Sequence, residues 1–317
     1  MRICARCGQE QAVAPGEPLW PLGWRCEGCG WQVGAAGAVA LLKPELADTA
    51  TGYSGHLFEF HAVHEASHFW FSPRRDLIVW ALRHFFPNAR SFMEIGCGNG
   101  PVLAAIAQMR PDLALFGAEL HPKGLERASQ RLGTRAQFVQ MDAREINLRD
   151  EIDVIGAFDV IEHIAEDERV LEQMYKAVRP GGGILVAVPQ HPFLWSESDE
   201  RLFHQRRYER GEMERKMRAA GFDVIWSTSY TSLLFPAMAA SRLLARPAGA
   251  GSGAGVGTGA VGAGQEDGLS EREFDVAPWL NRILKGIQDL EVKLTKSGMR
   301  WPVGGSRFVA GVKPASN

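Results

Sequence analysis

Three glycines at alternate positions, Gly96, Gly98 and Gly100, follow the acidic residue Glu94 in this chain. Glycine lets the backbone approach a ligand where a Cβ atom would clash. The dinucleotide-binding pattern G-x-G-x-x-G has a different spacing and holds a pyrophosphate at a helix N-terminus. A carboxylate directed into such a pocket would repel a phosphate but would suit an ammonium group. The spacing therefore predicts a site for a small ligand that carries an amino group.

Three further acids follow apolar runs that read as strands. Glu119 ends the run 113–119, where an acid is placed to accept hydrogen bonds from both hydroxyls of a ribose. Asp142 lies near the end of a third run, and Asp159 directly follows a fourth. Because the carboxyl ends of parallel strands meet at one edge of a sheet, we expect all four acids to line a single site.

Strand-like and helix-like segments alternate along the middle of the chain, which predicts an α/β fold with a doubly wound, mostly parallel sheet. Two later runs complete an expected total of seven strands. The expected strands are 92–95, 113–119, 137–143, 152–158, 183–189, 222–230 and 306–312, and the expected intervening helices are 101–110, 122–131 and 167–178.

The pattern E-x-G-x-G-x-G resembles the first motif of class I S-adenosylmethionine-dependent methyltransferases, which have a Rossmann-like seven-strand sheet. The resemblance implies that Glu94 binds the methionine amino group and that Asp142, next to Ala143, accepts a hydrogen bond from the adenine amino group. The run His68-Phe69-Trp70-Phe71-x-x-Arg74 resembles an element found upstream of this motif in bacterial relatives. There it implies that Arg74 meets the cofactor carboxylate.

The segment 158–164 resembles the corresponding part of ubiquinone-biosynthesis O-methyltransferases, some of which bind a divalent ion through acid-x-x-Glu-His. The resemblance makes Asp159, Glu162 and His163 candidate ligands for an ion such as magnesium, although Asp159 is one methylene shorter than the glutamate of those relatives. Without an ion, His163 can act as a general base that Glu162 orients. In a third interpretation, Glu162 caps the next helix and His163 packs on the sheet.

The loop after the fifth strand carries side chains suited to binding an acceptor. It resembles a segment of natural-product methyltransferases, and arginines there can contact a carboxylate or phosphate through two hydrogen bonds. Alternatively, Asp199 and Arg207 form an ion pair that only holds the loop. His204 is a second candidate base. The candidate acceptor-binding residues are Trp195, Asp199, Arg206, Arg207 and Tyr208.

Four of the five cysteines form two Cys-x-x-Cys pairs, Cys4 with Cys7 and Cys26 with Cys29. This spacing is typical of a zinc ribbon with four thiolate ligands. A glycine follows each pair and allows backbone amides to turn toward the sulfur atoms. A closed four-thiolate shell has no open position for chemistry, which indicates a structural or adaptor role. Disulfide bonds are the competing interpretation, and a cytosolic setting disfavours them.

Four histidines, His56, His61, His64 and His68, lie close together before the first expected strand. Their spacing permits a metal site, but Glu65 and the neighbouring aromatic residues suit an amphipathic helix that caps the cofactor cleft equally well, and we favour the helix. Ser72 and Pro73 then predict an N-cap and first position for a helix over 74–86.

The chain divides by composition into five expected parts. An insertion of helical segments, 233–244 and 278–296, separates the sixth and seventh strands and suggests an acceptor lid, a dimer contact or a peripheral membrane contact. The second segment is expected to be amphipathic, with one apolar stripe formed by Leu280, Ile283, Leu284, Ile287, Leu290 and Leu294. The parts are a zinc ribbon (1–34), a linker with cap helices (35–90), the core (91–231), the insertion with a glycine-rich linker at 247–264 (232–304), and the last strand (305–317).

A net charge of −2 and a pI near 6.5 show no general basic bias toward nucleic acid. The sequence shows no secretory signal or membrane-spanning run, so a cytoplasmic protein is expected. The interpretation we favour is methyl transfer to a hydroxyl of a small molecule. The alternatives are an RNA methyltransferase guided by the ribbon, whose three arginines are few for a tight phosphate contact, and a non-catalytic protein that binds the cofactor and a partner.

Overall fold

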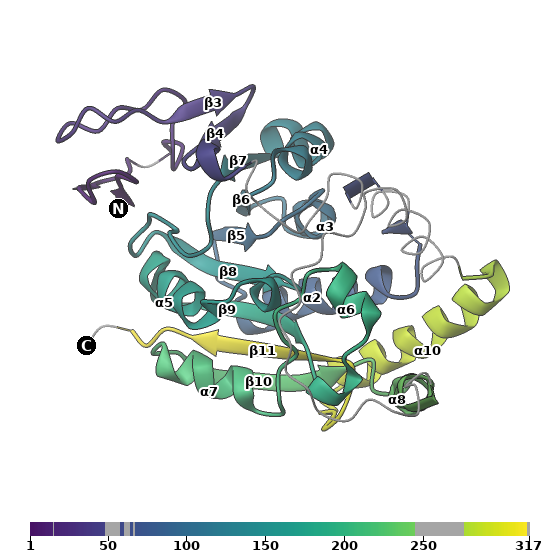
Figure 1. Cartoon of the computed structure of the whole chain (residues 1–317). Helices are drawn as coiled ribbons and strands as arrows, with labels where there is room; N and C mark the ends of the chain where they lie inside the picture. The colour runs from purple at the N-terminus through teal and green to yellow at the C-terminus, as the bar shows by residue number, and fades with distance from the viewer. Residues whose placement is uncertain (15, 48–57, 60–63, 66, 245–275, 316–317) are drawn as a thin grey trace, which may run out of the picture.

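A nine-stranded sheet forms the centre of the protein in the computed structural model, which describes residues 1–14, 16–47, 58–59, 64–65, 67–244 and 276–315 (Figure 1). The strand order is β10-β11-β9-β8-β5-β6-β7-β4-β3. The strands are β3 (Gly34–Ala36), β4 (Val39–Leu41), β5 (Ser91–Ile95), β6 (Ala114–Glu119), β7 (Ala136–Gln140), β8 (Ile152–Phe158), β9 (Val178–Pro189), β10 (Asp223–Tyr230) and β11 (Ser306–Val312).

The six strands from β4 to β9 are parallel, while β3, β10 and β11 join the two ends of the sheet in antiparallel fashion. The chain moves outward from β5 through β6 to β7 and then returns to β8 on the other side of β5. This reversal is a topological switch point, where open α/β sheets bind ligands. The carboxyl ends of β5, β6, β7 and β8 therefore meet where the sequence predicts a site.

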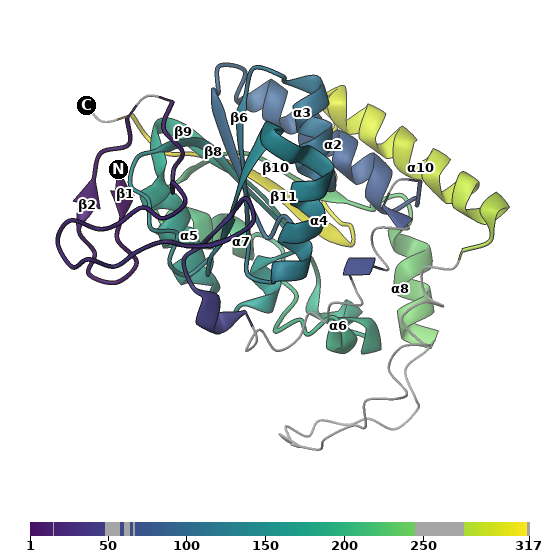
Figure 2. The ribbon, with the colours of Figure 1, turned by 90° about the horizontal axis from the view of Figure 1, so that it is seen from above.

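Helices cover both faces of the sheet (Figures 1 and 2). On one face α2, α3 and α10 lie side by side, with α4 next to α3, and on the other face α5 packs against α7. The helices are α2 (Phe71–Phe85), α3 (Pro101–Met109), α4 (Pro122–Leu132), α5 (Asp167–Ala177), α6 (Glu197–Arg201), α7 (Glu212–Ala219), α8 (Phe235–Leu244) and α10 (Pro278–Lys296), with short 3-10 turns at Pro44–Leu46, Gly133–Arg135, Ile161–His163 and Pro192–Leu194.

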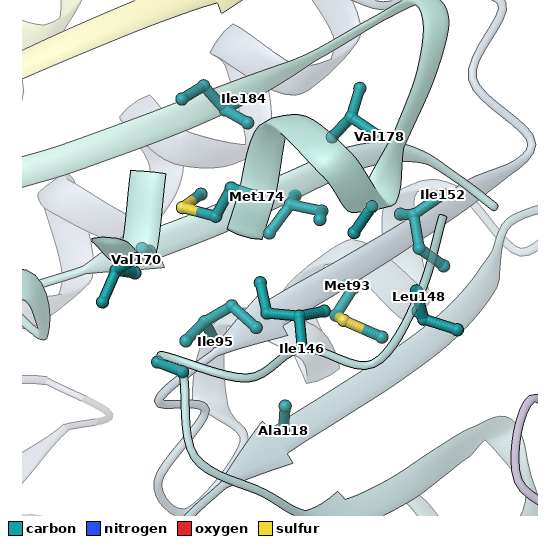
Figure 3. Packing of buried hydrophobic residues seen from close by; sticks show 14 of the residues in the cluster. Met93, Ile95, Ala118, Ile146, Leu148, Ile152, Val170, Met174, Val178 and Ile184 are labelled. Atoms are coloured by element: carbon teal, nitrogen blue, oxygen red, sulfur yellow. The ribbon is translucent and has the colours of Figure 1, made fainter. Parts of the chain in front are cut away.

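Alternate side chains of each central strand enter two separate hydrophobic clusters. In β5, Phe92 packs with α2 and α3, whereas Met93 and Ile95 pack with α5 and with Ile146 (Figure 3). Strand side chains alternate between faces, so a parallel strand covered by helices on both sides must be apolar throughout. This explains why the predicted strands appear as continuous apolar runs.

The expected seven strands are all present, and the central sheet adds two more, β3 and β4. Residues 34–41, which the sequence assigned to the end of the ribbon and the start of the linker, form the hairpin β3–β4, and β4 pairs in parallel with β7. The glycine-rich segment 247–264 and the histidines His56 and His61 lie outside the described residues. The rings of His64 and His68 have their centroids 6.3 Å apart.

The predicted start of the helix after residue 72 was wrong, because α2 begins at Phe71. The amides of Phe71 and Ser72 both donate to the carbonyl of His68, so a turn already formed there leads into the helix. Pro73 lies in the first turn, where its missing N–H would have had no helical acceptor in any case.

The bounds of α10 match the predicted helix, but its predicted apolar stripe is not its buried face. The stripe was Leu280, Ile283, Leu284, Ile287, Leu290 and Leu294, and Ile283 and Leu290 are 52% and 50% exposed. The buried residues are Gln288, Glu291, Val292 and Thr295. Glu291 accepts a hydrogen bond from the amide of Leu233, so polar contacts decide which face turns inward. No helix among the described residues has the length and apolar character needed to cross a bilayer.

Candidate functional site: a cavity at the carboxyl ends of the strands

A cavity of about 640 Å³ lies at the carboxyl ends of the central strands. Its lining contains all but one of the residues that the sequence predicts for the cofactor; Gly100 is the exception. The lining residues of this predicted set are Arg74, Glu94, Gly96, Gly98, Glu119, Asp142, Ala143 and Asp159.

The turn after β5 requires glycine at each of its three alternate positions. Gly96, Gly98 and Gly100 have φ values of +67°, +50° and +73°, which residues with a Cβ atom rarely adopt. A Cβ atom on Gly96 would lie 2.2 Å from Cγ2 of Val160. One on Gly100 would lie 3.0 Å from Cδ1 of Leu132. The motif thus reflects both backbone conformation and close packing around the cavity.

Glu94 is a buried carboxylate, 4% exposed, at the end of β5. Its Oε2 atom has no hydrogen-bond partner among the described residues. Burial raises the pKa of Glu94 well above its usual value, and the nearby positive charge of Arg74 opposes this rise. An unpaired buried acceptor is costly unless a ligand completes it. Glu94 therefore fits a ligand that brings an ammonium group.

Glu119 holds the glycine turn in place. Its Oε2 accepts from the amide of Gly98 at 3.2 Å, and its Oε1 accepts from the amides of Leu120 and His121 at 2.8 and 3.0 Å. Burial raises the pKa of Glu119, while these backbone donors favour its charged form. A carboxylate has about four acceptor positions, so one remains for a ribose hydroxyl.

Asp142 is fixed by Arg144, which lies two residues later. The amide of Arg144 donates to Oδ1 at 2.8 Å, and its guanidinium contacts both carboxylate oxygens. Burial alone would raise the pKa of Asp142, but these hydrogen bonds and the charge of Arg144 outweigh it and lower the pKa. The wall formed by residues 141–144 is therefore held in one conformation.

Arg74 and Asp159 form an ion pair at the cavity, with Nη2 2.6 Å from Oδ2. Asp159 adopts a φ of +54°, an uncommon conformation for a residue with a side chain. Arg74 and Glu94 also line the same cavity, and the charge of Arg74 opposes the rise of the Glu94 pKa. One guanidinium thus serves two carboxylates of the cavity.

Glu162, His163 and His204 offer ligand atoms that lie within 4.8 Å of one another. The structure groups His204, rather than Asp159, with Glu162 and His163, because Asp159 pairs with Arg74. Glu162 is fully buried, and neither of its carboxylate oxygens has a hydrogen-bond partner in the part of the chain that the structure describes. Burial, together with the charge of Asp159, raises the pKa of Glu162 well above its usual value.

His163 lines the cavity, and burial together with His204 lowers its pKa to about 4. The two imidazole rings have their centroids 4.7 Å apart. His204 is oriented by Asp199, since Nδ1 of His204 lies 2.8 Å from Oδ1 of Asp199. His163 is therefore an uncharged imidazole at neutral pH, next to a second imidazole with a fixed orientation.

The five predicted acceptor-binding residues make contacts within the protein, and none lies in the lining of this cavity. Asp199 caps α6 and accepts from Nε of Arg207 at 2.7 Å, which is the ion pair that the sequence suggested as the alternative. Arg206 and the fully buried Tyr208 both contact Asp167, at 3.0 and 2.9 Å. Trp195 is 38% exposed and donates to Glu200.

Two residues of this loop that sequence reasoning missed, Phe203 and Gln205, do line the cavity. Phe203 is 47% exposed and has a φ of +57°. Both residues flank His204, and this position in the loop could have identified them as lining residues. The sequence prediction instead chose their neighbours with charged or polar side chains, because those residue types suit ligand binding.

The four cysteines lie together as the spacing predicts. The Sγ atoms of Cys4 and Cys29 are 3.7 Å apart, as are those of Cys7 and Cys26, and all four lie within 4.8 Å of one another. Four thiolates around one zinc ion at about 2.3 Å would have neighbouring sulfurs roughly 3.8 Å apart, whereas a disulfide needs about 2.05 Å. Gly8 and Gly30 adopt φ values of +74° and +71° after the two pairs. The donor set therefore fits zinc.

The middle of the chain is similar in sequence to known methyltransferases. Residues 93–184 match the family model described as "Methyltransferase domain". The "Probable S-adenosylmethionine-dependent methyltransferase" of Mycolicibacterium smegmatis is 27% identical over 165 residues, which are 49% of this chain and 60% of that protein. A ubiquinone biosynthesis O-methyltransferase of Cupriavidus pinatubonensis is 24% identical over 159 residues, or 45% of this chain and 63% of that protein. The chain thus spans under two thirds of the length of these relatives.

Among solved structures, the phosphoethanolamine N-methyltransferase 2 of Haemonchus contortus in complex with S-adenosyl-L-methionine superposes with a TM-score of 0.54. The match has 18% sequence identity and covers 85% of this chain and 59% of that chain. At this identity the likeness shows the fold alone. The sequence matches show a methyltransferase domain over residues 93–184 and, over about half of the chain, similarity to proteins named as S-adenosylmethionine-dependent methyltransferases.

Proposed function

We propose that the protein transfers a methyl group from S-adenosylmethionine to a hydroxyl group of a small molecule. The observation that carries this proposal is the convergence of four carboxylates, each placed at or just after the end of a different parallel strand, on one cavity. The cofactor carries an ammonium group, a carboxylate, a ribose and an adenine. We assign one polar residue of the cavity to each of these groups.

In this proposal Glu94 receives the ammonium group and Arg74 the carboxylate of the methionine part. Arg74 would then exchange its contact with Asp159 for a contact with the cofactor. Glu119 accepts from the ribose, and Asp142 lies beside the adenine. When bound, the cofactor supplies an activated methyl group, and the protein contributes alignment of the acceptor, worth on the order of 7 to 11 kcal/mol in favourable cases.

A hydroxyl acceptor must lose its proton, and His163 is our proposed base. It lines the cavity, and its lowered pKa keeps it unprotonated and able to accept a proton at neutral pH. The same lowered pKa makes His163 a weak base. We therefore also consider a second way to deprotonate the hydroxyl. A divalent ion held by Glu162, His163 and His204 would instead lower the pKa of the hydroxyl itself. The similarity to a ubiquinone biosynthesis O-methyltransferase supports oxygen as the acceptor atom.

Zinc at the four cysteines is part of the same proposal. The sulfur separations of 3.7 Å fit a tetrahedral thiolate shell. Such a site is closed, so its role is structural.

The test is a screen of hydroxylated phenols, sugars and polyketides, read as formation of S-adenosylhomocysteine. Each hydroxyl compound is paired with its amine analogue, and turnover is expected with hydroxyls only. His163→Asn should abolish most of that turnover, while Arg110→Met, at the opposite end of the strands, should leave it unchanged. Turnover restricted to amines would contradict the choice of oxygen. Turnover that stops without added magnesium would favour the ion over the base.

A further inference from the structure

The first residues of the chain are hydrogen-bonded to the segment that follows the adenine side of the cavity. The amide of Ile3 donates to the carbonyl of Asn147 at 2.8 Å, and the amide of Arg149 donates to the carbonyl of Met1 at 2.9 Å. Arg2 lies opposite Leu148 in this antiparallel arrangement. Cys4, a metal-ligand candidate, directly follows Ile3. A short backbone connection therefore links the cysteine group to residues 147–149.

Arg2 is buried between the two parts, with an exposed fraction of 0%. Its guanidinium lies 2.6 Å from Oε1 of Glu17 and 5.3 Å from the ring centroid of Trp24. An arginine with this burial needs both partners to offset the loss of water. Glu17 and Trp24 both belong to the segment between the two cysteine pairs, so Arg2 connects the β1 strand (Arg2–Ile3) to the rest of that segment.

Apolar side chains of the cysteine-bearing segment belong to the same hydrophobic cluster as the cavity wall. Leu19, Trp20 and Val33 pack in one cluster with Met141, Ala143, Ile146 and Leu148. Of these, Met141 and Ala143 also line the cavity. The segment thus shares one hydrophobic cluster with the wall that carries Asp142, and the amide of Leu19 donates to Oε1 of Gln137 on β7 at 3.1 Å.

A second connection leads through the β3–β4 hairpin. The amide of Lys43 donates to Oε1 of Gln140 at 3.0 Å, and Nε2 of Gln140 donates to the carbonyl of Lys43 at 2.7 Å. Lys43 also pairs with Glu145 at 2.7 Å. Residues 136–149 are therefore held on one side by contacts that all come from the first 43 residues.

We expect those first residues to depend on a metal for their own structure. Among its described residues, the segment 1–33 contains only two very short strands, β1 and β2 (Glu10–Gln11), and it is too small to form a core of its own. Small domains with four thiolate ligands fold when they bind their metal. Loss of the metal should therefore weaken the backbone hydrogen bonds between residues 1–3 and residues 147–149. The cavity wall at residues 141–149 should become more mobile as a result.

We propose that the four-cysteine module is a structural part of the cofactor site, so that metal occupancy at Cys4, Cys7, Cys26 and Cys29 sets the affinity for S-adenosylmethionine. The inference rests on the proposed function for the identity of the ligand. The module acts on binding by positioning residues 141–149 and does not contact the cofactor. The same coupling makes affinity sensitive to chelation and to oxidation of the thiols, of which Cys7 is exposed.

The experiment compares the metal-loaded protein with the same protein after chelation, using S-adenosylhomocysteine as the probe in calorimetry. Hydrogen exchange is followed in parallel over residues 137–149. We expect chelation to weaken binding at least tenfold and to speed exchange of the Arg149 amide, with both effects reversed by added Zn²⁺. Equal affinity and equal exchange in the two states would overturn the inference.

If the chelated protein does not stay folded, a variant that keeps its metal tests the same inference. Arg2→Met keeps all four cysteines but removes the buried contact to Glu17, so it should retain one metal per chain and still bind the probe several-fold more weakly. The matched control is Arg110→Met, which removes a largely buried arginine from its pair with Asp112 at the amino ends of the strands. Arg2→Met with unchanged affinity and unchanged exchange contradicts the inference. Absence of probe binding by the metal-loaded parent would contradict the proposed function instead, and the exchange measurement would still decide the coupling.

Discussion

At the scale of single residues, Gly96 combines a left-handed backbone with a close neighbour. Gly96→Ala should lower the free energy of unfolding for two reasons. The φ of +67° is unfavourable for alanine, and the new Cβ atom would lie 2.2 Å from Cγ2 of Val160. Gly211→Ala is the matched control, because Gly211 is left-handed with a φ of +76° and a Cβ atom there would meet only the end of the Arg215 side chain, at 3.6 Å. We expect a loss of about 1 to 2 kcal/mol at Gly211 and roughly 1 to 3 kcal/mol more at Gly96. Denaturant titration measures both losses.

The contribution of Val160 can be separated with a second substitution. Val160→Ala in the Gly96→Ala background should recover part of the extra loss, because it removes the methyl groups nearest the new Cβ atom. Equal losses at Gly96 and Gly211 would show that packing against Val160 is unimportant.

His163 should make stability depend on pH. Its pKa is about 4 in the folded protein, below the 6.5 of an unfolded chain, so the unfolded state binds more protons between these values. The free energy of unfolding should fall as the pH drops from about 6.5 to 4, by about 3 kcal/mol from this residue. His163→Asn should remove that part of the slope. A variant with the same pH dependence as the parent would mean that His163 is not buried as an uncharged imidazole.

Residue-level prediction from sequence succeeded best where backbone geometry restricts residue type. The three glycines of the turn all need positive φ, and the acids that follow the strands all reach the cavity. It was weakest for Asp199 and Arg207, since their types suit both ligand binding and an internal ion pair. Only the contacts in the folded structure, such as the Asp199–Arg207 hydrogen bond, distinguish ligand binding from an internal ion pair.

At the scale of elements, one buried ion pair joins α7 to the sheet. Nη2 of Arg307 on β11 lies 2.6 Å from Oε1 of Glu214 on α7, and both side chains are largely buried. Arg307→Met should cost about 3 to 5 kcal/mol, because it leaves a buried carboxylate without its charged partner. The double variant with Glu214→Leu should regain most of that loss. Thermal unfolding measures all three proteins, and a double variant as unstable as the single one would contradict this account.

Element bounds were predictable where strand or helix patterns are strong, as for β11 and α10, which match their predicted ranges. The face that α10 buries was not. Its buried face includes Gln288 and Glu291, which hydrogen-bond to Thr231 and Leu233. These partners are 57 and 58 residues away in the sequence. A helical pattern of apolar residues carries no information about such distant polar partners.

At the scale of the whole molecule, the fold class followed from alternating apolar runs, but the arrangement of the N-terminal residues did not. The cysteine pairs predicted a metal module by their spacing. Nothing in that spacing indicated that Ile3 would bond to Asn147 or that β4 would extend the sheet at β7. These contacts make the module a support for the cavity wall, which is how the inference about metal and cofactor arises.

The most direct test of the central claim is calorimetric titration of the folded, metal-loaded protein with S-adenosylmethionine at two temperatures. We predict one site per chain and a loss of about 1.5 to 3 kcal/mol in binding free energy for Glu119→Ala, the size of hydrogen bonds to a charged group. Arg110→Met should bind like the parent. Absence of binding at both temperatures, or a Glu119→Ala variant that binds as tightly as the parent, would contradict the claim that these carboxylates enclose this cofactor.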